Sequence, residues 1–379
     1  MQEFRFDPPV MPEGAAALRA RVRAFIGEQR AGRGLGGVAN CWAVADPAFS
    51  RALGKAGFIG MTWPSRYGGQ GRGMLERYIV IEELLAAGMP VGFHWVADRQ
   101  SGALLLRYGN DIQRETYLPG MARGEICFAI GMSEPGAGSD LAAVRTKAVR
   151  SDGGWRVSGQ KLWTTNAHVA DAMIALVRTG AGSQRQEGLS QFIIDLHAPG
   201  VTVRPITDLA GGADFNEVFL DDVFVADDML VGQEGGGWQQ VTAELSLERS
   251  GPERYLSSFV LFTALLRLAG PDPEPALRDL IGQLSAQYWT LRQMSLSVAA
   301  QLAAGHDPAI EAAIVKDIGN GFEQEMPRLI QAIAGGDWGD DSHFSQVLSL
   351  LLQISASFSL RGGTREILRG IIARGLGLR

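Results

Sequence analysis

The spacing of apolar residues changes twice along the chain. In the first part, apolar positions recur at steps of three and four, as in "LERYIVIEELLAAGMP" (75–90), whose closing glycine and proline are typical of a helix end. A Pro-Gly pair in "ETYLPGMARGE" (115–125) predicts the end of another helix. This pattern predicts an N-terminal helical domain over residues 1–126.

From about residue 127 the apolar residues come in short runs rich in Val, Ile and Phe, separated by glycine-containing turns. The runs are "GWRVSG", "DAMIALVRT", "SQFIIDL", "VTVRPI" and "NEVFLDDVFV". They are typical of an antiparallel sheet or a small barrel, so we expect a central β domain over 127–236. Helical periodicity returns near "GQEGGGW" and predicts a C-terminal helical bundle over 237–379. The expected fold is therefore an α+β multidomain protein in the order helical, β, helical.

Composition narrows the class of protein. The net charge is −6 and no basic block occurs, which argues against nucleic acid as a partner. Cys41 and Cys127 are far apart, which excludes a disulfide framework and fits a cytoplasmic protein. The charged, proline-rich first residues are unlike a signal peptide. The longest apolar run (347–360) reads as a buried helix, too short and polar for stable membrane insertion. The five histidines lack ligand spacing, so we expect no metal site.

Two motifs carry candidate chemistry. In "GMSEPGAGSD" (131–140), small residues let backbone N–H groups approach a ligand, and serine hydroxyls add donors, although a loop that merely turns has the same composition. In "GQKLWTTN" (159–166), Trp163 offers a flat ring beside polar side chains. The alternative for this second motif is a strand end with a tryptophan in the core.

These motifs occur together with "WPSRYGG" (63–69), "ETYLPGMARGE", "VFLDDVFV" (218–225) and "GGTREILRGIIAR" (362–374). In this order, and over nearly the whole chain, the set resembles the acyl-CoA dehydrogenase family. The resemblance implies a flavoprotein with FAD between the β domain and the C-terminal helices. By similarity, the cofactor-binding residues are Ile130, Met132, Ser133, Ser139, Trp163, Thr164, Thr165, Thr364 and Glu366.

The resemblance also implies the reaction. An acyl-CoA thioester is dehydrogenated to the trans-2-enoyl-CoA: a carboxylate takes the α-proton, flavin N5 takes the β-hydride, and the electrons pass to electron-transfer flavoprotein. Many relatives carry the carboxylate in an "EGT" triplet, where this chain has Gly362, Gly363 and Thr364. A smaller group, including isovaleryl-CoA and long-chain enzymes, carries it in "LER", and "LSLER" here places Glu248 at that position.

Glu248 is therefore the predicted catalytic base. The predicted substrate-binding residues are Ser139, Ser246, Arg249, Gly362 and Gly363. For Arg249 a structural ion pair is an equal alternative. Glu244 and Glu253 are interpreted as ordinary surface or structural charges.

The chain departs from the family at two places. The "RxxFG" stretch whose arginine reaches a neighbouring subunit's FAD is not recognisable, and a glycine stretch with the same role is reduced to "IAGGDWGDD" (333–341). We therefore expect either a homo-oligomer (dimer or tetramer) or a hetero-oligomer with a related chain.

Three alternatives for the function stay open. The chain could be the catalytic subunit of a hetero-oligomeric steroid-type enzyme, a non-catalytic partner subunit, or an offshoot with oxidase or monooxygenase chemistry. Glu248 argues against the non-catalytic subunit. The acyl group is not specified by the sequence.

Overall fold

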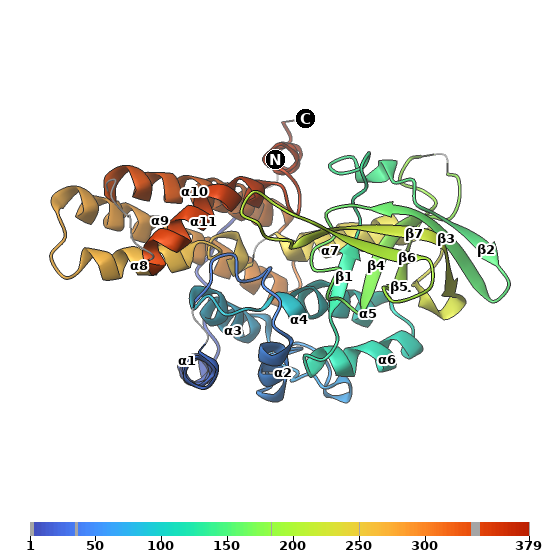
Figure 1. Cartoon of the computed structure of the whole chain (residues 1–379), viewed down its shortest axis with the longest axis horizontal. Helices are drawn as coiled ribbons and strands as arrows, with labels where there is room; N and C mark the ends of the chain where they lie inside the picture. Colours follow the sequence, from blue (N-terminus) through green and yellow to red (C-terminus); the bar gives the residue numbers. More distant parts are fainter. Residues whose placement is uncertain (1–3, 35–36, 183, 250, 335–341, 379) are drawn as a thin grey trace. The chain divides into compact units, whose positions relative to one another are not determined.

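The structure is a computed structural model that describes residues 4–34, 37–182, 184–249, 251–334 and 342–378, without the side chains of 33, 245–248 and 334. The chain divides into two compact units. We call Ala43–Arg72 with Pro90–Leu245 the sheet unit, and Met1–Trp42 with Gly73–Met89 and Ser246–Arg379 the helical unit. Each is described by itself (Figure 1).

The sheet unit combines one large sheet with short helices. Its helices are α2 (Pro47–Lys55), α4 (Gly92–Val96), α5 (Gly102–Tyr108) and α6 (Asp111–Ala122). Its strands are β1 (Phe128–Gly131), β2 (Lys147–Ser151), β3 (Gly154–Lys161), β4 (Ala172–Arg178), β5 (Leu189–Asp195), β6 (Val201–Ile206), β7 (Phe215–Ala226) and β8 (Leu230–Val231).

The sheet is mainly antiparallel, as the sequence predicts. The strand order is β6-β7-β3-β2-β4-β5-β8, and β1 pairs with β4 outside this path. Two pairs are parallel, β1 with β4 and β2 with β4. The near-continuous apolar sequence of β4 follows from burial on both faces: Met173 and Val177 pack with Trp155, whereas Ile174 packs with Leu105 of α5.

Helix α6 corrects one sequence prediction. The Pro-Gly pair at 119–120 does not end the helix, because α6 continues through Pro119 to Ala122. The backbone turns instead at Gly124, where φ is +68°, a conformation that glycine adopts without steric cost.

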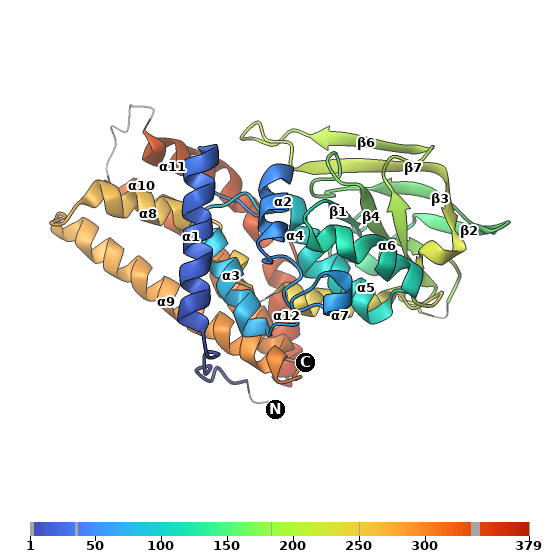
Figure 2. The same ribbon diagram turned by 90° about the horizontal axis from the view of Figure 1, so that it is seen from below.

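The helical unit contains α1 (Ala15–Arg33), α3 (Met74–Ala86), α8 (Phe259–Ala269), α9 (Pro275–Ala303), α10 (Ala309–Ala334), α11 (His343–Ile354) and α12 (Arg365–Gly375). Helix α3 packs against α1 and α9, α10 packs against α9 and α12, and α11 packs against α8 (Figure 2). Helix α7 (Gly237–Glu248) begins in the sheet unit, and its last three residues belong to the helical unit.

The apolar run 347–360 is not one buried helix. Helix α11 ends at Ile354 and a 3-10 turn follows at Ser355–Ser359. Val347, Leu348 and Leu351 are buried, while the other face of α11 is half-buried or exposed, so the run is amphipathic. No helix in the part of the chain that the structure describes has the length and apolar character needed to cross a bilayer.

Candidate active site

The structure brings the glycine-rich motif and the tryptophan motif together in the sheet unit. Ile130 near the end of β1 is half-buried, as are Met132 and Ser133 directly after the strand. The Ser133 carbonyl accepts a hydrogen bond from the backbone N–H of Leu162 at 2.9 Å. Three predicted cofactor-binding residues therefore lie beside the segment that leads into Trp163.

The second half of the glycine-rich loop is open. A β-carbon added to Gly136 or Gly138 would meet no atom within 4 Å. Ser139 follows them and is exposed. The backbone here leaves room for a close ligand, and the role of this loop in cofactor binding stays a prediction.

A buried ion pair that no sequence motif predicted holds this loop. Lys161 Nζ lies 2.8 Å from Glu134 Oε1 and donates to the Met132 carbonyl at 3.3 Å. The Glu134 carboxylate also accepts from the backbone N–H groups of Arg145 (2.6 Å) and Thr146 (3.0 Å). The pair thus fixes the loop that carries Met132 and Ser133 to strand β3.

Burial and pairing act on both charges. Burial lowers the pKa of Lys161 to about 8, and the Glu134 carboxylate opposes that change. Burial acts to raise the pKa of Glu134, but the Lys161 charge and the hydrogen bonds outweigh it and lower that pKa. Both groups therefore remain charged at neutral pH. In the sequence, the only indication of this ion pair was a glutamate inside the glycine-rich motif and a lysine two residues before Trp163.

Trp163 is exposed, so the alternative interpretation of this motif, a strand end with a tryptophan in the core, is wrong. Its side chain is 55% exposed, and Phe215 meets its ring edge-on at a centroid distance of 6.0 Å. Its backbone φ is +61°, which is rare for an aromatic residue. Such a conformation persists only where the surroundings impose it, and here it accompanies an exposed ring.

The two threonines after Trp163 differ in burial. Thr164 is 1% exposed, and its backbone N–H and carbonyl bond to the carbonyl and side-chain amide of Asn216 at 3.0 and 2.9 Å. Its Oγ1 has no hydrogen-bond partner among the residues that the structure describes. Thr165 is half-buried. An exposed aromatic ring, an unused hydroxyl and an open backbone loop together fit a flavin cofactor.

In the helical unit, the "LER" segment meets the C-terminal glycine turn. Glu248 is the last residue of α7, and Arg249 follows it. Arg249 is half-buried, and its Nε donates to the Gly362 carbonyl at 3.4 Å. The side chains of Ser246 and Glu248 lie outside the described residues, as do residues 335–341 of "IAGGDWGDD".

The glycine turn has a conformation that explains its sequence. Gly362 and Gly363 have φ of +65° and +101°, values that side-chain-bearing residues rarely adopt. Lys316 of α10, which is fully buried, donates from Nζ to the carbonyls of Arg361 and Gly363. No sequence motif marks Lys316, because it lies in an otherwise ordinary helix 46 residues before the turn.

Thr364 and Glu366 begin α12. Thr364 is the N-cap, and its Oγ1 accepts from the backbone N–H of Ile367 at 3.5 Å. Glu366 is exposed, and hydrogen bonds from its own backbone N–H and from Thr364 lower the pKa of its carboxyl. Both residues thus have a helix-capping role, and their contact with FAD stays a prediction.

Two carboxylates are buried rather than on the surface. Glu244 in the sheet unit is 3% exposed, and Glu253 in the helical unit is 2% exposed. Glu253 lies 3.3 Å from the Nε atom of the buried Arg254. Of the two roles predicted for these glutamates, surface charge is wrong, and their burial fits structural charges.

The helical unit also contains a buried carboxyl that the sequence did not single out. Glu323 of α10 has no exposed surface, and its Oε1 accepts from the backbone N–H and hydroxyl of Ser258 at 3.0 and 3.2 Å. Burial raises the pKa of Glu323 to about 7, against the lowering effect of Arg361 and Ser258.

Comparison with known families agrees with this architecture. Models of the N-terminal, middle and C-terminal domains of acyl-CoA dehydrogenase match residues 12–125, 129–223 and 272–377. The acyl-CoA dehydrogenase IpdE1 of Mycobacterium tuberculosis is 33% identical over 383 residues, covering 95% of this chain and 97% of that protein. FadE34 of the same organism is 32% identical over 86% of this chain, which spans only 45% of that longer relative.

A solved structure extends the likeness. The structure named Tcur3481-Tcur3483 steroid ACAD has a TM-score of 0.85 and 27% identity, with coverage of 97% of this chain and 98% of that one. Members of this family bind FAD and oxidise acyl-CoA thioesters. The helical–β–helical order, the two joined sheet-unit motifs and the full-length similarity to IpdE1 show that this chain belongs to the acyl-CoA dehydrogenase family.

Proposed function

We propose that the chain is an FAD-dependent acyl-CoA dehydrogenase in which Glu248 removes the α-proton of the thioester. The observation that carries this proposal is the hydrogen bond from Arg249 to Gly362. It joins the two segments in which this family carries its base, and of the two base positions only the one in "LER" has a carboxylate, because the other is Gly362. Since Glu248 directly precedes Arg249, it lies within one residue of that junction.

The position of Glu248 suits a base. As the last residue of α7, it lies at the negative end of the helix, where proton uptake is favoured. Arg249 and Lys316 both bond to carbonyls of the turn at 361–363, so the backbone on which an acyl chain would rest is held by two side chains. A general base acts efficiently only when it is held within hydrogen-bond reach of its proton.

The residues proposed to bind FAD are chosen by the groups that they offer to a flavin. When bound, FAD supplies the acceptor for the β-hydride. In the sheet unit, Trp163 offers its exposed ring, Thr164 and Thr165 offer hydroxyls, and the loop at 131–140 offers backbone N–H groups. The Lys161–Glu134 ion pair keeps this loop in place.

We infer further that the substrate is bulky. Glycine at 362 leaves free the volume that a glutamate occupies there in many relatives, which favours branched or steroid-derived acyl groups. The likeness to a steroid ACAD named for two proteins supports this, and it also favours a role as the catalytic subunit of a hetero-oligomer. Electron-transfer flavoprotein is the proposed electron acceptor.

The test is a screen of acyl-CoA thioesters against the FAD-loaded protein without oxygen. Bleaching of the flavin absorbance by at least one thioester is expected, followed by slow reoxidation in air. No bleaching by any thioester, with and without a related partner chain present, would refute the dehydrogenase. Rapid reoxidation with release of hydrogen peroxide would identify an oxidase instead.

A further inference from the structure

The side chain of Arg361, which directly precedes the glycine turn, contacts three segments of the helical unit. Its guanidinium carbon lies 4.0 Å from the ring centroid of Trp42 and 4.6 Å from that of Phe358. Its Nη1 donates to Asn40 Oδ1 at 3.4 Å, and its Nη2 donates to Ser257 Oγ at 3.3 Å. Arg361 therefore joins the glycine turn both to the segment after α1 and to the segment that follows "LER".

These two partner segments are bonded to each other. The backbone N–H of Asn40 donates to the Ser257 carbonyl at 2.9 Å, and the Ser257 hydroxyl donates to the Glu253 carbonyl at 2.9 Å. Ser257 is 1% exposed, and Phe358 has no exposed surface. The guanidinium of Arg361 thus rests on groups that are themselves held in place, and these contacts restrict where it can lie.

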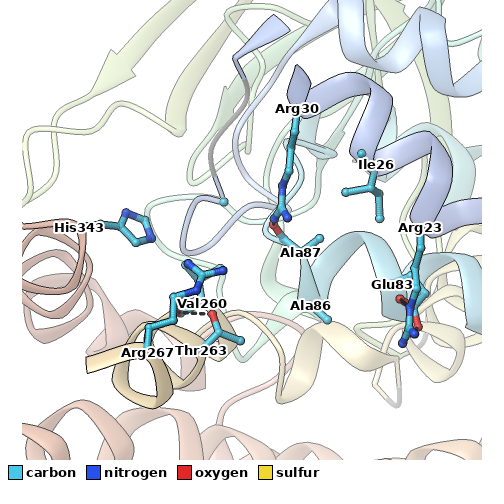
Figure 3. A pocket seen from close by; sticks show the side chains of 12 residues that line it. Arg23, Ile26, Arg30, Glu83, Ala86, Ala87, Val260, Thr263, Arg267 and His343 are labelled. Carbon is cyan, nitrogen blue, oxygen red and sulfur yellow. Dashed lines mark hydrogen bonds and ion pairs between the residues drawn. The ribbon is translucent and has the colours of Figure 1, made fainter. Parts of the chain in front are cut away.

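The segment after α1 is also tied to the end of α3. The backbone N–H of Val38 donates to the Gly88 carbonyl at 3.0 Å, and a β-carbon added to Gly88 would lie only 2.6 Å from the Val38 nitrogen. Arg30 of α1 donates to the Ala87 carbonyl at 2.7 Å, and these two residues face each other in Figure 3. The segment therefore packs closely against α3 and gives Arg361 a firm support.

The backbone of the glycine turn is held through its carbonyls. The Arg361 carbonyl accepts from Lys316 Nζ, and the Gly362 carbonyl accepts from Arg249 Nε at 3.4 Å. The glycines themselves offer no side chain, and glycine backbone has many allowed conformations. The position of the turn therefore depends on its neighbours. Among them, Arg361 has the side chain that reaches the segment after Glu248.

The positive charge of Arg361 acts on a carboxyl in the core. Arg361 acts to lower the pKa of Glu323, while burial raises that pKa to about 7. Glu323 also accepts two hydrogen bonds from Ser258, the residue after the Arg361 partner Ser257. A planar guanidinium that stacks on rings and donates through two nitrogens has a geometry that an amine or an amide cannot reproduce. The contacts around Arg361 are therefore specific to arginine.

We propose that Arg361 is a positioning residue of the proposed dehydrogenation, and that it sets the glycine turn against the segment of Glu248 through its stack on Trp42. This role rests on the proposed function, in which Glu248 is the base and the turn borders the acyl group. Arg361 acts through the backbone and takes no proton itself. Because a misplacement of about 1 Å can cost roughly 10²-fold in rate, loss of this support should slow the chemical step.

The test is the first-order rate constant of flavin reduction in anaerobic single turnovers, measured per bound FAD with a thioester that bleaches the flavin of the unaltered protein. Arg361→Gln should lower this rate constant by about tenfold to hundredfold, with little change in the thioester concentration that gives half the maximal rate. Arg369→Gln is the matched control, an exposed arginine of α12 that lies 3.3 Å from Asp317, and it should keep the unaltered rate. A purely structural role would lower the FAD-loaded fraction but not the rate per bound FAD.

Two substitutions of Trp42 test the stack. Trp42→Phe keeps an aromatic face for the guanidinium and should retain most of the rate, whereas Trp42→Leu removes that face and should approach Arg361→Gln. The double variant Trp42→Leu, Arg361→Gln should be no slower than Arg361→Gln, because both changes remove one contact. If Arg361→Gln does not load FAD, Arg361→Lys is measured instead. It keeps the charge near Glu323 but loses the planar fork, so a smaller fall in the same rate constant is expected.

An unaltered rate per bound FAD in Arg361→Gln would overturn the positioning role, as would an unaltered rate in Arg361→Lys where the glutamine variant does not load FAD. An equal fall in Arg369→Gln, or equal rates in Trp42→Phe and Trp42→Leu, would overturn it as well. Failure of the proposed function gives a different result. The unaltered protein would then not be reduced by any thioester, or Glu248→Gln would be reduced normally, and either result would remove the positioning role together with the proposed function.

Discussion

Lys161 and Glu134 form an ion pair at 2.8 Å in which the lysine side chain has no exposed surface. The pair links the end of β3 to the loop after β1, and the two predicted flavin motifs lie on these two segments. A buried pair of this kind contributes little net stability, yet loss of one partner leaves an uncompensated charge. Its value to the protein is therefore the fixed position of the loop.

Replacement of Lys161 should damage both stability and FAD binding. Lys161→Met leaves the Glu134 carboxylate buried without its cation, which typically costs about 3–5 kcal/mol of unfolding free energy. Chemical unfolding and FAD titration measure the two effects. The double variant Lys161→Met, Glu134→Gln should recover most of the stability. It should not recover the FAD affinity, because no side chain at position 161 then holds the loop through the Met132 carbonyl. Full recovery of both would show that the pair does not position the loop.

The sequence allowed prediction of the order of the helical and β domains and of the segments of the candidate site, but not of the side chains that hold those segments in place. Motifs such as "SEPGAGSD" indicate candidate ligand-facing residues, because those residues are small or polar next to one another in the sequence. Lys161, Lys316 and Glu323 act through contacts with segments 27 to 65 residues away, so their roles follow from tertiary packing. The helix end predicted at the Pro119–Gly120 pair was wrong, because α6 continues to Ala122 and the backbone turns at Gly124.

The glycine turn should reject side chains for conformational reasons. Gly362→Ala places a β-carbon at φ +65°, which costs roughly 1–2 kcal/mol. Gly370→Ala is the control, a helical glycine of α12 whose added β-carbon would meet nothing within 4 Å, and it should be neutral or stabilising by up to about 1 kcal/mol. Denaturant midpoints compare the two, and an equal effect would contradict the argument from φ.

Glu323 predicts a dependence of stability on pH. Its pKa is near 7 in the folded chain and 4.5 as its ordinary value, so the folded chain keeps a proton that the unfolded chain releases. Its stabilising contribution is thus fully present below about pH 4.5 and is lost as the pH rises to about 7. Relative to Glu323→Gln, the unfolding free energy of the unaltered protein should fall by about 3 kcal/mol across this window. Parallel profiles for the two proteins would show that Glu323 does not titrate there.

Because residue 362 is a glycine without a side chain, we expect a preference for bulky substrates. Branched or steroid-derived acyl-CoAs should reduce the flavin with a higher kcat/KM than butyryl-CoA, because a short straight chain leaves the free volume unfilled. Single-turnover reduction rates over a series of thioesters measure the preference. A clear preference for butyryl-CoA would contradict the inference of a bulky substrate.

The decisive variant for the chemistry is Glu248→Gln. Glutamine keeps the shape of the side chain but lacks the basic oxygen, so the variant should bind FAD and acyl-CoA and yet lose flavin reduction. General-base catalysis typically supplies roughly 10²–10⁴-fold, and a loss of at least this size is expected in the anaerobic reduction rate. Binding is checked by the shift of the flavin spectrum on addition of acyl-CoA. Glu253→Gln alters the other carboxylate that follows in "LSLERSGPER", and its folded fraction should still reduce the flavin. Near-normal reduction by Glu248→Gln, or loss of reduction only in Glu253→Gln, would place the base elsewhere than at the end of α7.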